Sequence, residues 1–230
     1  MESDWENKIK ALIKRRYARQ NRNKNRNSIS PHEMGYPQEI LENLPSTLLQ
    51  QYSGCGYLFR DIEFNSNELI LDLGSGAGLD SYLATKYFNA GRVLSLDLTF
   101  EMLENHHIYN INAICGDMEY LPINDLQLDV IIANASLNLA TNKEKALGEA
   151  FRVLKHNGRI IMRDVINVGE LPQEVLIDPL SFNTSLGGAL NEQSLRSKIE
   201  SVGFVDIDIS DHQPFSYLES VKIEATKPPN

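Results

Sequence analysis

The feature that most constrains this chain is a short apolar run that ends abruptly in three glycines. The run covers residues 69–73, and Gly74, Gly76 and Gly78 follow with one residue between each pair. Such a run is typical of a strand buried on both faces of a parallel sheet. Glycine lacks a Cβ, so the loop can turn tightly and a ligand can approach its backbone. The start of a following helix, with its unpaired N–H groups, would favour an anionic part of a nucleotide-like ligand.

The spacing of the glycines decides between two kinds of ligand. A dinucleotide fingerprint has the pattern G-x-G-x-x-G, whose third glycine serves helix packing beside a pyrophosphate. Here the pattern is G-x-G-x-G, and Leu79 stands where that third glycine would fall. Asp72 and Asp80 flank the loop, which also contains Ser75. Carboxylates at these positions would repel a pyrophosphate but would suit a ligand that carries an ammonium group.

Two further apolar runs end in acidic residues, as expected of neighbouring strands. Residues 93–96 are followed by Asp97, nineteen residues beyond the last glycine, and residues 111–114 lead to Asp117 and Met118. An acid at the end of the second strand is placed to accept both hydroxyls of a ribose. The residues after the third run would meet an adenine ring. For each run taken alone, an ordinary loop is the alternative to a ligand-binding loop. The succession of the runs, each followed by an acid, favours an adenosine-like ligand.

These three segments resemble motifs of the class I S-adenosylmethionine-dependent methyltransferases. The matching stretches are Leu-Asp-Leu-Gly-Ser-Gly-Ala-Gly at 71–78, Leu-Asp-Leu-Thr-Phe-Glu-Met-Leu at 96–103 and Gly-Asp-Met-Glu-Tyr-Leu-Pro at 116–122. The resemblance covers residues 40–226. It implies S-adenosylmethionine as cofactor and transfer of its methyl group.

Within this class the chain is most similar to the arsenite methyltransferases, and next to the quinone-ring methyltransferases of ubiquinone and menaquinone synthesis. Three segments point to the arsenite branch. They are Ser-Gly-Cys-Gly at 53–56, Ile-Ile-Ala-Asn-Ala-Ser-Leu-Asn-Leu at 131–139 and Gly-Gly-Ala-Leu at 187–190.

Hydrophobic periodicity predicts alternating strands and helices. Lys155 to Gly158 are expected to stop a helix and turn, and 166–190 to form a long connection. The resulting fold class is α/β: a Rossmann-like, doubly wound, mostly parallel sheet of the seven-stranded class I methyltransferase type, with an N-terminal helical cap. We divide the chain into a basic helix with a polar linker at 1–36 and a cofactor-binding domain at 37–230. Strands are expected at 69–73, 92–96, 111–115, 128–133 and 158–164, and a terminal hairpin at 204–210 and 219–226. Helices are expected at 4–20, 37–50 with an interruption at Pro45, 78–88, 99–106, 141–154 and 191–202.

The resemblance also implies roles at the cofactor site. Leu98 and Met118 would pack on the adenine, and Asp117 would accept from its amino group. Asp72 would orient the loop or the ligand's ammonium, and Asn134 would lie next to the reacting methyl. Simpler roles stay open: a turn cap for Asp72, core packing for Met118 and turn formation for Asn134. The predicted cofactor-binding residues are Asp72, Gly74, Ser75, Gly76, Asp97, Leu98, Asp117, Met118 and Asn134; no catalytic residue is identified, since a general base is needed only if the nucleophile holds a proton.

The methyl acceptor is where this chain departs from the arsenite branch. The resemblance implies three cysteine thiolates for trivalent arsenic, a soft ion that prefers sulfur. Cys55 matches the first, whereas Ala135 and Ser185 stand at the other two positions. We therefore expect that the scaffold is kept, that the arsenic site is lost, and that a pocket with Ala135, Asn183 and Ser185 takes an organic molecule. Cys55 is then either structural or a substrate contact, and Tyr17 is the candidate for a lid tyrosine that folds over the cofactor.

Composition narrows the cellular setting. The 230 residues are 42% hydrophobic, enough for one domain with a cap. No apolar run reaches the roughly 18 residues of a membrane span, and we expect none. The two cysteines argue for a reducing compartment, so we expect a cytoplasmic protein. Cys115 is expected to be a small buried hydrophobe. No cluster of His, Cys, Asp and Glu has the spacing of metal ligands, so we expect no metal.

Charge is unevenly distributed along the chain. The first 30 residues hold nine basic and three acidic side chains, a net charge of +6, whereas the remaining 200 hold 13 and 28, a net charge of −15. The basic stretch is either a solvated helix face or an arm that binds nucleic acid. Because an acidic body is a poor partner for a polyanion, we expect a small-molecule acceptor rather than nucleic acid. An RNA-directed methyltransferase and a non-catalytic cofactor-binding regulatory protein remain the alternatives, and the sequence does not indicate the oligomeric state.

Overall fold

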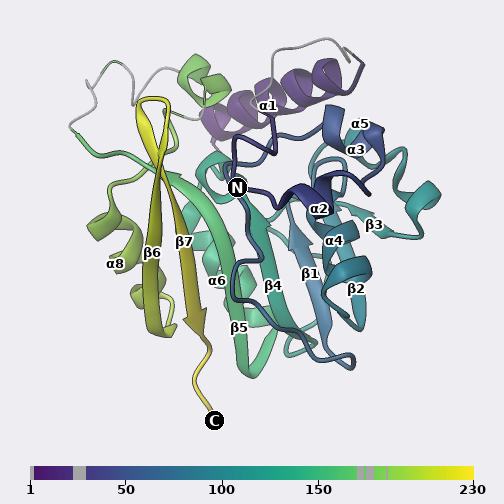
Figure 1. The fold of residues 1–230 in the computed structure, drawn as a ribbon. Coiled ribbons are helices and arrows are strands. Elements are labelled where there is room, and N and C mark those ends of the chain that lie inside the picture. Colours follow the sequence, from purple (N-terminus) through teal and green to yellow (C-terminus); the bar gives the residue numbers. More distant parts are fainter. Residues whose placement is uncertain (1–2, 23–29, 170–173, 175–178, 185) are drawn as a thin grey trace.

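A seven-stranded mixed sheet forms the centre of the molecule in the computed structural model, which describes residues 3–22, 30–169, 174, 179–184 and 186–230 (Figure 1). The strand order is β3-β2-β1-β4-β5-β7-β6. The first five strands are mutually parallel, and β7 pairs antiparallel with both β5 and β6. The strand bounds are β1 Leu69–Leu73, β2 Arg92–Asp97, β3 Asn112–Cys115, β4 Leu128–Asn134, β5 Leu154–Ile166, β6 Val205–Phe215 and β7 Leu218–Thr226.

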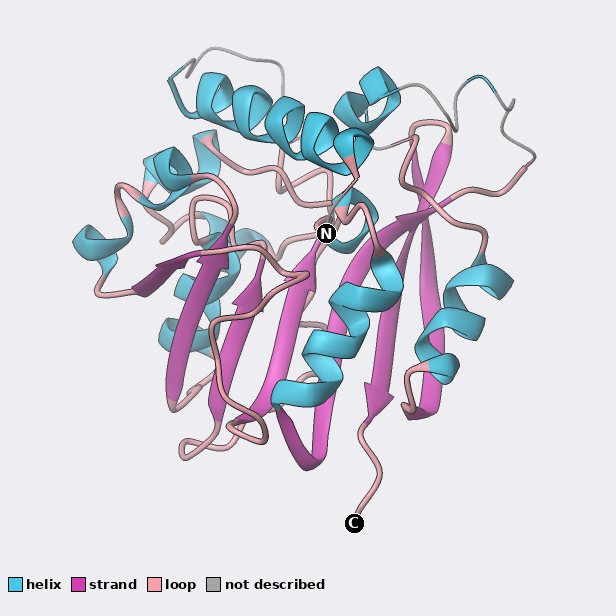
Figure 2. Ribbon diagram, turned by 180° about the vertical axis from the view of Figure 1, so that it is seen from behind, coloured by secondary structure: helices cyan, strands magenta, loops and turns pink. Residues whose placement is uncertain are grey.

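Helices cover both faces of the sheet. In Figure 2, α6 and α8 lie in front of the sheet, while α2, α3 and α4 lie on the face seen in Figure 1. Side chains alternate along a strand, so Leu71 packs with the α6 side of the core and Ile70 with the α4 side. The helix bounds are α1 Asp4–Arg22, α2 Gln38–Leu41, α3 Ser46–Gln50, α4 Leu79–Tyr87, α5 Phe100–Leu103, α6 Lys143–Val153 and α8 Glu192–Ser201, with short 3-10 helices η1 His106–Tyr109, η2 Leu137–Leu139 and η3 Pro179–Thr184.

The strand order reverses between β1 and β4. The chain adds β2 and β3 on one side of β1 and then returns to place β4 on the other side. In open α/β sheets this point leaves a crevice outside the carboxyl ends of the strands. Helix α1 lies across that end of the sheet in both views (Figures 1 and 2). The α/β fold class predicted from the sequence is confirmed, and the division at residue 36 stays a prediction.

Three predicted elements differ in detail. The helix expected over 37–50 is interrupted at Pro45 as predicted, but its two parts, α2 and α3, are short; Pro37 and Pro45 precede them because proline suits a helix start. The helix expected over 99–106 ends at Leu103 and is followed by η1. The turn expected at 155–158 lies within β5 as an irregularity: Leu128 pairs with Leu154 and Val130 with Arg159.

The C-terminal elements follow the sequence prediction closely. Asn191 caps α8, its side chain accepting a hydrogen bond from the Ser194 N–H at 2.8 Å. Gly203 follows with a φ of +106°, a conformation that favours glycine. Among the described residues, no helix is long and apolar enough to cross a bilayer.

Candidate active site

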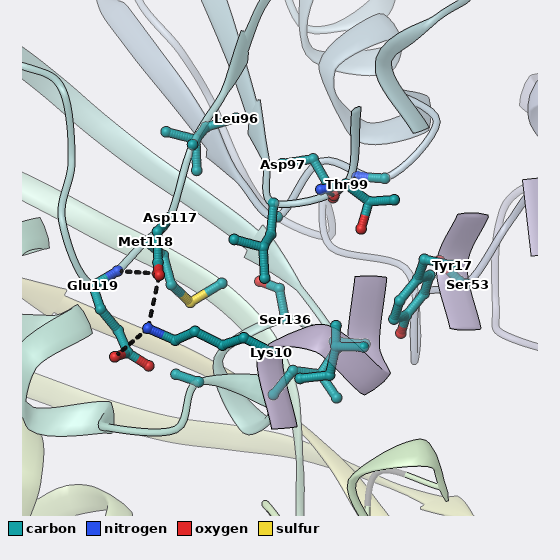
Figure 3. Close-up of a pocket in the computed structure, with 18 of the residues that line it drawn as sticks. Lys10, Tyr17, Ser53, Leu96, Asp97, Thr99, Asp117, Met118, Glu119 and Ser136 are labelled. Atoms are coloured by element: carbon teal, nitrogen blue, oxygen red, sulfur yellow. Dashed lines mark hydrogen bonds and ion pairs between the residues drawn. The ribbon is translucent and has the colours of Figure 1, made fainter. Parts of the chain in front are cut away.

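A cleft of about 650 Å³ opens at the carboxyl ends of β1, β2, β3 and β4, beneath α1 (Figure 3). The fold brings together residues from six separate stretches of sequence. Nine residues predicted for the site line this cleft: Tyr17, Gly74, Gly76, Asp97, Leu98, Asp117, Met118, Asn134 and Ala135. Its lining also includes Lys10, Ile13, Ser53, Leu96, Thr99, Gly116, Glu119, Ser136, Leu139 and Ala140.

The glycine loop forms a close-packed turn rather than a nest of free donors. Gly74 has a φ of +78°, and a Cβ there would lie 2.4 Å from the Cβ of Ser136. The N–H groups of Gly74 and Ser75 both donate to the Leu96 carbonyl, at 2.8 and 2.9 Å, and the Gly76 N–H donates to Asp97. These three donors are therefore used inside the protein. The loop contributes its shape to the cleft, and the expectation that the start of the following helix favours an anionic part of the ligand stays a prediction.

Asp97 joins the end of β2 to the glycine loop. Its Oδ2 accepts from the Gly76 N–H at 2.9 Å, and its Oδ1 accepts from the Thr99 N–H at 2.7 Å. Burial raises the pKa of Asp97, and these backbone hydrogen bonds oppose that rise. An ionised carboxylate has about four acceptor positions, so Asp97 has capacity for further donors from the cleft.

Asp117 and Met118 line the other side of the cleft, after β3 (Figure 3). Asp117 Oδ1 accepts from the Glu119 N–H at 2.9 Å, and its Oδ2 lies 2.7 Å from Lys10 Nζ. Sequence reasoning missed Lys10, which it counted with the basic face of the first helix. The signal was present in the spacing, because Lys10, Ile13 and Tyr17 recur at three and four residues and share one face of a helix.

A smaller cavity of about 360 Å³ adjoins the cleft, and Asp72, Ser75 and Asp80 are among its lining residues. Asp72 Oδ2 accepts from Ser81 Oγ at 2.7 Å. Burial, and then the neighbouring Asp80, raise the pKa of Asp72 to about 8. Burial likewise raises the pKa of Asp80, against hydrogen bonds from Asn134 and Tyr36. No ion pair of the described part of the chain reaches either acid, so this acidic pair would favour a cation in the cavity.

The acidic pair predicts an unusual pH dependence of stability. Because Asp72 has a higher pKa in the folded state than the 3.8 of an ordinary carboxyl, the folded state binds its proton more tightly. We expect the free energy of unfolding to fall as pH rises from about 4 to about 8, by up to roughly 1.4 kcal/mol per pH unit. Asp72→Asn should make this slope shallower, and the raised pKa values of the buried Asp80 and Asp164 account for the slope that remains at lower pH. Urea unfolding at several pH values measures the slope. Glu104→Gln, at an exposed acid, is the control, and an unchanged slope in Asp72→Asn would contradict the assignment.

Asn134 holds the Gly-Cys-Gly turn against the sheet. Its Oδ1 accepts from the Cys55 N–H at 2.9 Å, and its Nδ2 donates to the Gly56 carbonyl at 2.9 Å and to Asp80 Oδ2 at 3.0 Å. Ala135, rather than Asn134, has the positive φ of the turn after β4, at +54°. The side chain of Asn134 is thus a buried connector, and its predicted place next to the reacting methyl stays a prediction.

The remaining predicted substrate residues are spread out. Cys55 is fully buried, packs with Val165, Ala189 and Leu218, and lines neither cavity. Burial raises the pKa of its thiol to about 12. Asn183 lies in η3, but its side chain is outside the described part of the structure, as is all of Ser185.

The expectation of a buried Cys115 is wrong. This residue is exposed. It ends β3, which is the edge strand of the sheet and therefore has no strand beyond it. A short apolar run alone does not distinguish an edge strand from a central one. Among the described residues, no group of three or more His, Cys, Asp or Glu side chains is placed to hold a metal ion.

The comparison with known families decides what kind of domain this is. Residues 64–203 match the family described as "Methyltransferase domain", with the glycine loop, Asp97, Asp117 and Asn134 inside the match. The chain belongs to this methyltransferase domain family. Its fold is that of class I methyltransferases.

Curated relatives of this methyltransferase domain include several arsenite methyltransferases. The one from Halobacterium salinarum is 32% identical over 76% of this chain and 50% of its own length. The human one is 33% identical over 72% of this chain and 48% of its own length. The chain spans about half the length of these relatives.

Solved structures show the same likeness. An arsenic(III) S-adenosylmethionine methyltransferase from Chlamydomonas reinhardtii superposes with a TM-score of 0.71 at 25% identity, covering 83% of this chain and 72% of that one. Phosphoethanolamine N-methyltransferase 2 from Haemonchus contortus, solved with S-adenosyl-L-methionine, gives 0.61 at 16% identity, covering 76% and 54%. The second likeness is one of fold alone.

Proposed function

We propose that this protein transfers a methyl group from S-adenosylmethionine to a small organic acceptor. The observation that carries the proposal is the single cleft at the ends of β1 to β4, which gathers the glycine loop, Asp97, Asp117 and Met118 beneath α1. The methyltransferase relatives support it. No observation favours the RNA-directed or the non-catalytic alternative, and the basic helix α1 packs on the protein's own body through Ile9 and Ile13.

The lining suits three parts of an adenosyl sulfonium, namely its ribose, its adenine and its ammonium group. At Gly74 a Cβ would collide with Ser136, so the loop can lie this close to the turn after β4 only without a side chain. Asp97 has acceptor capacity for ribose hydroxyls, while Leu98 and Met118 supply apolar contacts for an adenine. The buried acids of the adjoining cavity, Asp72 and Asp80, would compensate an ammonium group. The ribose, the adenine and the ammonium group of the ligand therefore each find side chains of matching chemistry.

This chain's own residues would act mainly by positioning and by excluding water. S-adenosylmethionine supplies a sulfonium methyl that is already electrophilic, so the protein need not activate it. Ile13 and Tyr17 of α1 cover the cleft from above, and Leu139 and Ala140 close it with apolar surface. Holding two reactants in line inside a dry site accounts for much of the rate of such a displacement.

The acceptor we propose is organic rather than arsenite. Ala135 lines the cleft at a position where the resemblance implies an arsenic-binding thiolate. The one matching thiol, Cys55, is buried outside the cleft with a pKa raised to about 12, so it is held as a thiol. A soft metalloid ion needs several thiolates together. The relatives' named substrate is therefore a poor fit to this cleft.

The two cysteines should differ sharply in reactivity. We expect one thiol, Cys115, to react quickly with Ellman's reagent in the folded protein, and Cys55 to react only after denaturation, because one is exposed and the other fully buried. Cys115→Ser is the matched control and should show no fast thiol. Two fast thiols in the wild-type protein would mean that Cys55 is accessible and would reopen the arsenite assignment.

The function itself is tested in two steps. Isothermal titration with S-adenosylmethionine and separately with NAD establishes the cofactor, and tight binding of NAD with no response to the sulfonium compound would overturn the proposal. Methyl-labelled S-adenosylmethionine is then incubated with the protein and either a small-molecule extract or arsenite under reducing conditions. We expect label in an organic product. Label in methylated arsenic alone would overturn the acceptor class while leaving the cofactor in place.

A further inference from the structure

Several contacts hold helix α1 on the rest of the molecule, and three of them mark its start, its middle and its end. Near its start, the ring of Trp5 meets Phe182 edge to face, with centroids 5.8 Å apart. Near its end, Asn21 Nδ2 donates to the Glu101 carbonyl at 2.5 Å. Between them Lys10 reaches down into the cleft (Figure 3). The first and last contacts are at the ends of the helix, so Lys10 is the polar contact that lies over the proposed adenine end.

Lys10 forms a double ion pair that joins distant parts of the chain. Its Nζ lies 2.7 Å from Asp117 Oδ2 and 2.9 Å from Glu119 Oε2. Lys10 is 8% exposed and Glu119 only 2% exposed. Charge-assisted hydrogen bonds of this kind are strong, and a buried charge that loses its partner is costly. The pair therefore ties α1 to the segment after β3.

Glu119 is fixed from its other side as well. Its Oε1 accepts from the Thr141 N–H and hydroxyl, both at 2.7 Å, and from the Asn142 N–H at 2.9 Å. Burial alone would raise the pKa of Glu119, but the bonds from Lys10, Asn142 and Thr141 outweigh it and lower the pKa. Thr141 and Asn142, at the start of α6, thus hold Glu119 with its Oε2 toward Lys10.

Asp117 has its orientation set by the same arrangement. The Glu119 N–H holds one carboxylate oxygen and Lys10 the other. Two of about four acceptor positions are then used, and the rest are available to a donor in the cleft. Lys10 and an adenine amino group can therefore share this carboxylate rather than compete for it.

We propose that Lys10 is a positioning residue of the cleft: it orients Asp117 and fastens α1 over the adenine end. The identity of the ligand rests on the proposed function, whereas the fastening of α1 does not. Because α1 covers the cleft, the ion pairs of Lys10 must open before the ligand can leave. Loss of Lys10 should therefore speed ligand release.

The test uses the full chain, S-adenosylhomocysteine as probe, and Trp5, the chain's single tryptophan, as a reporter of α1. Lys10→Met keeps the side-chain length and removes the charge. We expect roughly 10- to 100-fold weaker binding, chiefly through faster dissociation, together with red-shifted and more readily quenched Trp5 emission. Lys10→Arg should rescue both readouts in large part. Lys14→Met, at an exposed lysine of the same helix, should match the wild type.

Two outcomes would overturn the proposal. The first is a Lys10→Met protein whose dissociation rate and Trp5 emission are both unchanged. The second is tighter binding, which would make Lys10 a competitor of the ligand. If Lys10→Met does not fold, Glu119→Gln replaces it, because the amide keeps an acceptor for Thr141 and Asn142 but weakens the attraction to Lys10. If the wild type binds no S-adenosylhomocysteine, the proposed function fails, and Trp5 emission alone then decides the fastening of α1.

Discussion

Asp97→Ala should bind S-adenosylhomocysteine about 10- to 100-fold more weakly than the wild type, since each lost polar partner costs roughly 1–3 kcal/mol. The substitution removes the acceptor proposed for the ribose hydroxyls. It also leaves the Gly76 and Thr99 N–H groups, now bonded to Asp97 at 2.9 and 2.7 Å, without their partner. The glycine loop then loses its hydrogen bond to β2, so the cleft changes shape as well as losing an acceptor.

Calorimetric titration measures the effect, and circular dichroism checks that the variant is folded. Asp97→Asn separates the two contributions, because the amide retains one oxygen that can accept from the Gly76 N–H. We expect its affinity to lie between those of the wild type and Asp97→Ala. Glu104→Ala, at an exposed acid after α5, controls for the loss of negative charge. A dissociation constant that stays the same in Asp97→Ala would refute the role assigned to Asp97.

Arg163→Met should lower the free energy of unfolding by about 3–5 kcal/mol, as expected when one member of a buried ion pair is removed. Arg163 is fully buried in β5. Its Nη1 lies 2.7 Å from Asp211 Oδ2, its Nη2 donates to the Asp211 carbonyl at 3.0 Å, and its Nε donates to Ser220 Oγ at 2.9 Å. Asp211 retains some access to water, so the lower end of the range applies.

Denaturant unfolding of Arg163→Met beside Arg159→Met tests this expectation. Arg159 lies on the same strand and pairs with Glu68 at 2.7 Å, but its side chain is 31% exposed, so its loss should cost about 1 kcal/mol or less. A second readout is the reactivity of the Cys55 thiol toward Ellman's reagent. A Cβ at Gly56 would lie 2.0 Å from Arg163 Nε, so the Gly-Cys-Gly turn rests directly on this side chain. Equal losses in the two variants would contradict the role of the buried pair.

The parts of the site that the sequence predicted are those encoded locally. The apolar run at 69–73 and the glycines after it specify a strand and a tight turn, and the structure has both. Asp97 and Asp117 follow their strands directly, so a parallel sheet necessarily brings them to one edge. The prediction of burial was wrong for Cys115, because an apolar run does not reveal that its strand lies at the edge of the sheet.

Other features arise only where distant segments meet. Lys10 reads as one cation among nine in a basic stretch, yet its partners lie more than a hundred residues away. Asn134 reads as the end of a strand, yet its amide holds the turn at Cys55 and Gly56. Helical spacing puts Lys10 on the face of α1 that carries Ile13 and Tyr17, but the partners of Lys10 and Asn134 cannot be read from the sequence, because burial and charge partners are properties of the packed chain.

The sequence by itself therefore determined the α/β architecture and the carboxyl ends of the strands as the place for a ligand, because periodicity and glycine geometry act over a few residues. The tertiary structure alone decided that the N–H groups of Gly74, Ser75 and Gly76 are bonded inside the protein, that the Cys55 thiol is buried outside the cleft, and that Lys10 of α1 pairs with Asp117 and Glu119. The physical reason is that the ionisation, accessibility and orientation of a side chain depend on neighbours that only folding brings near.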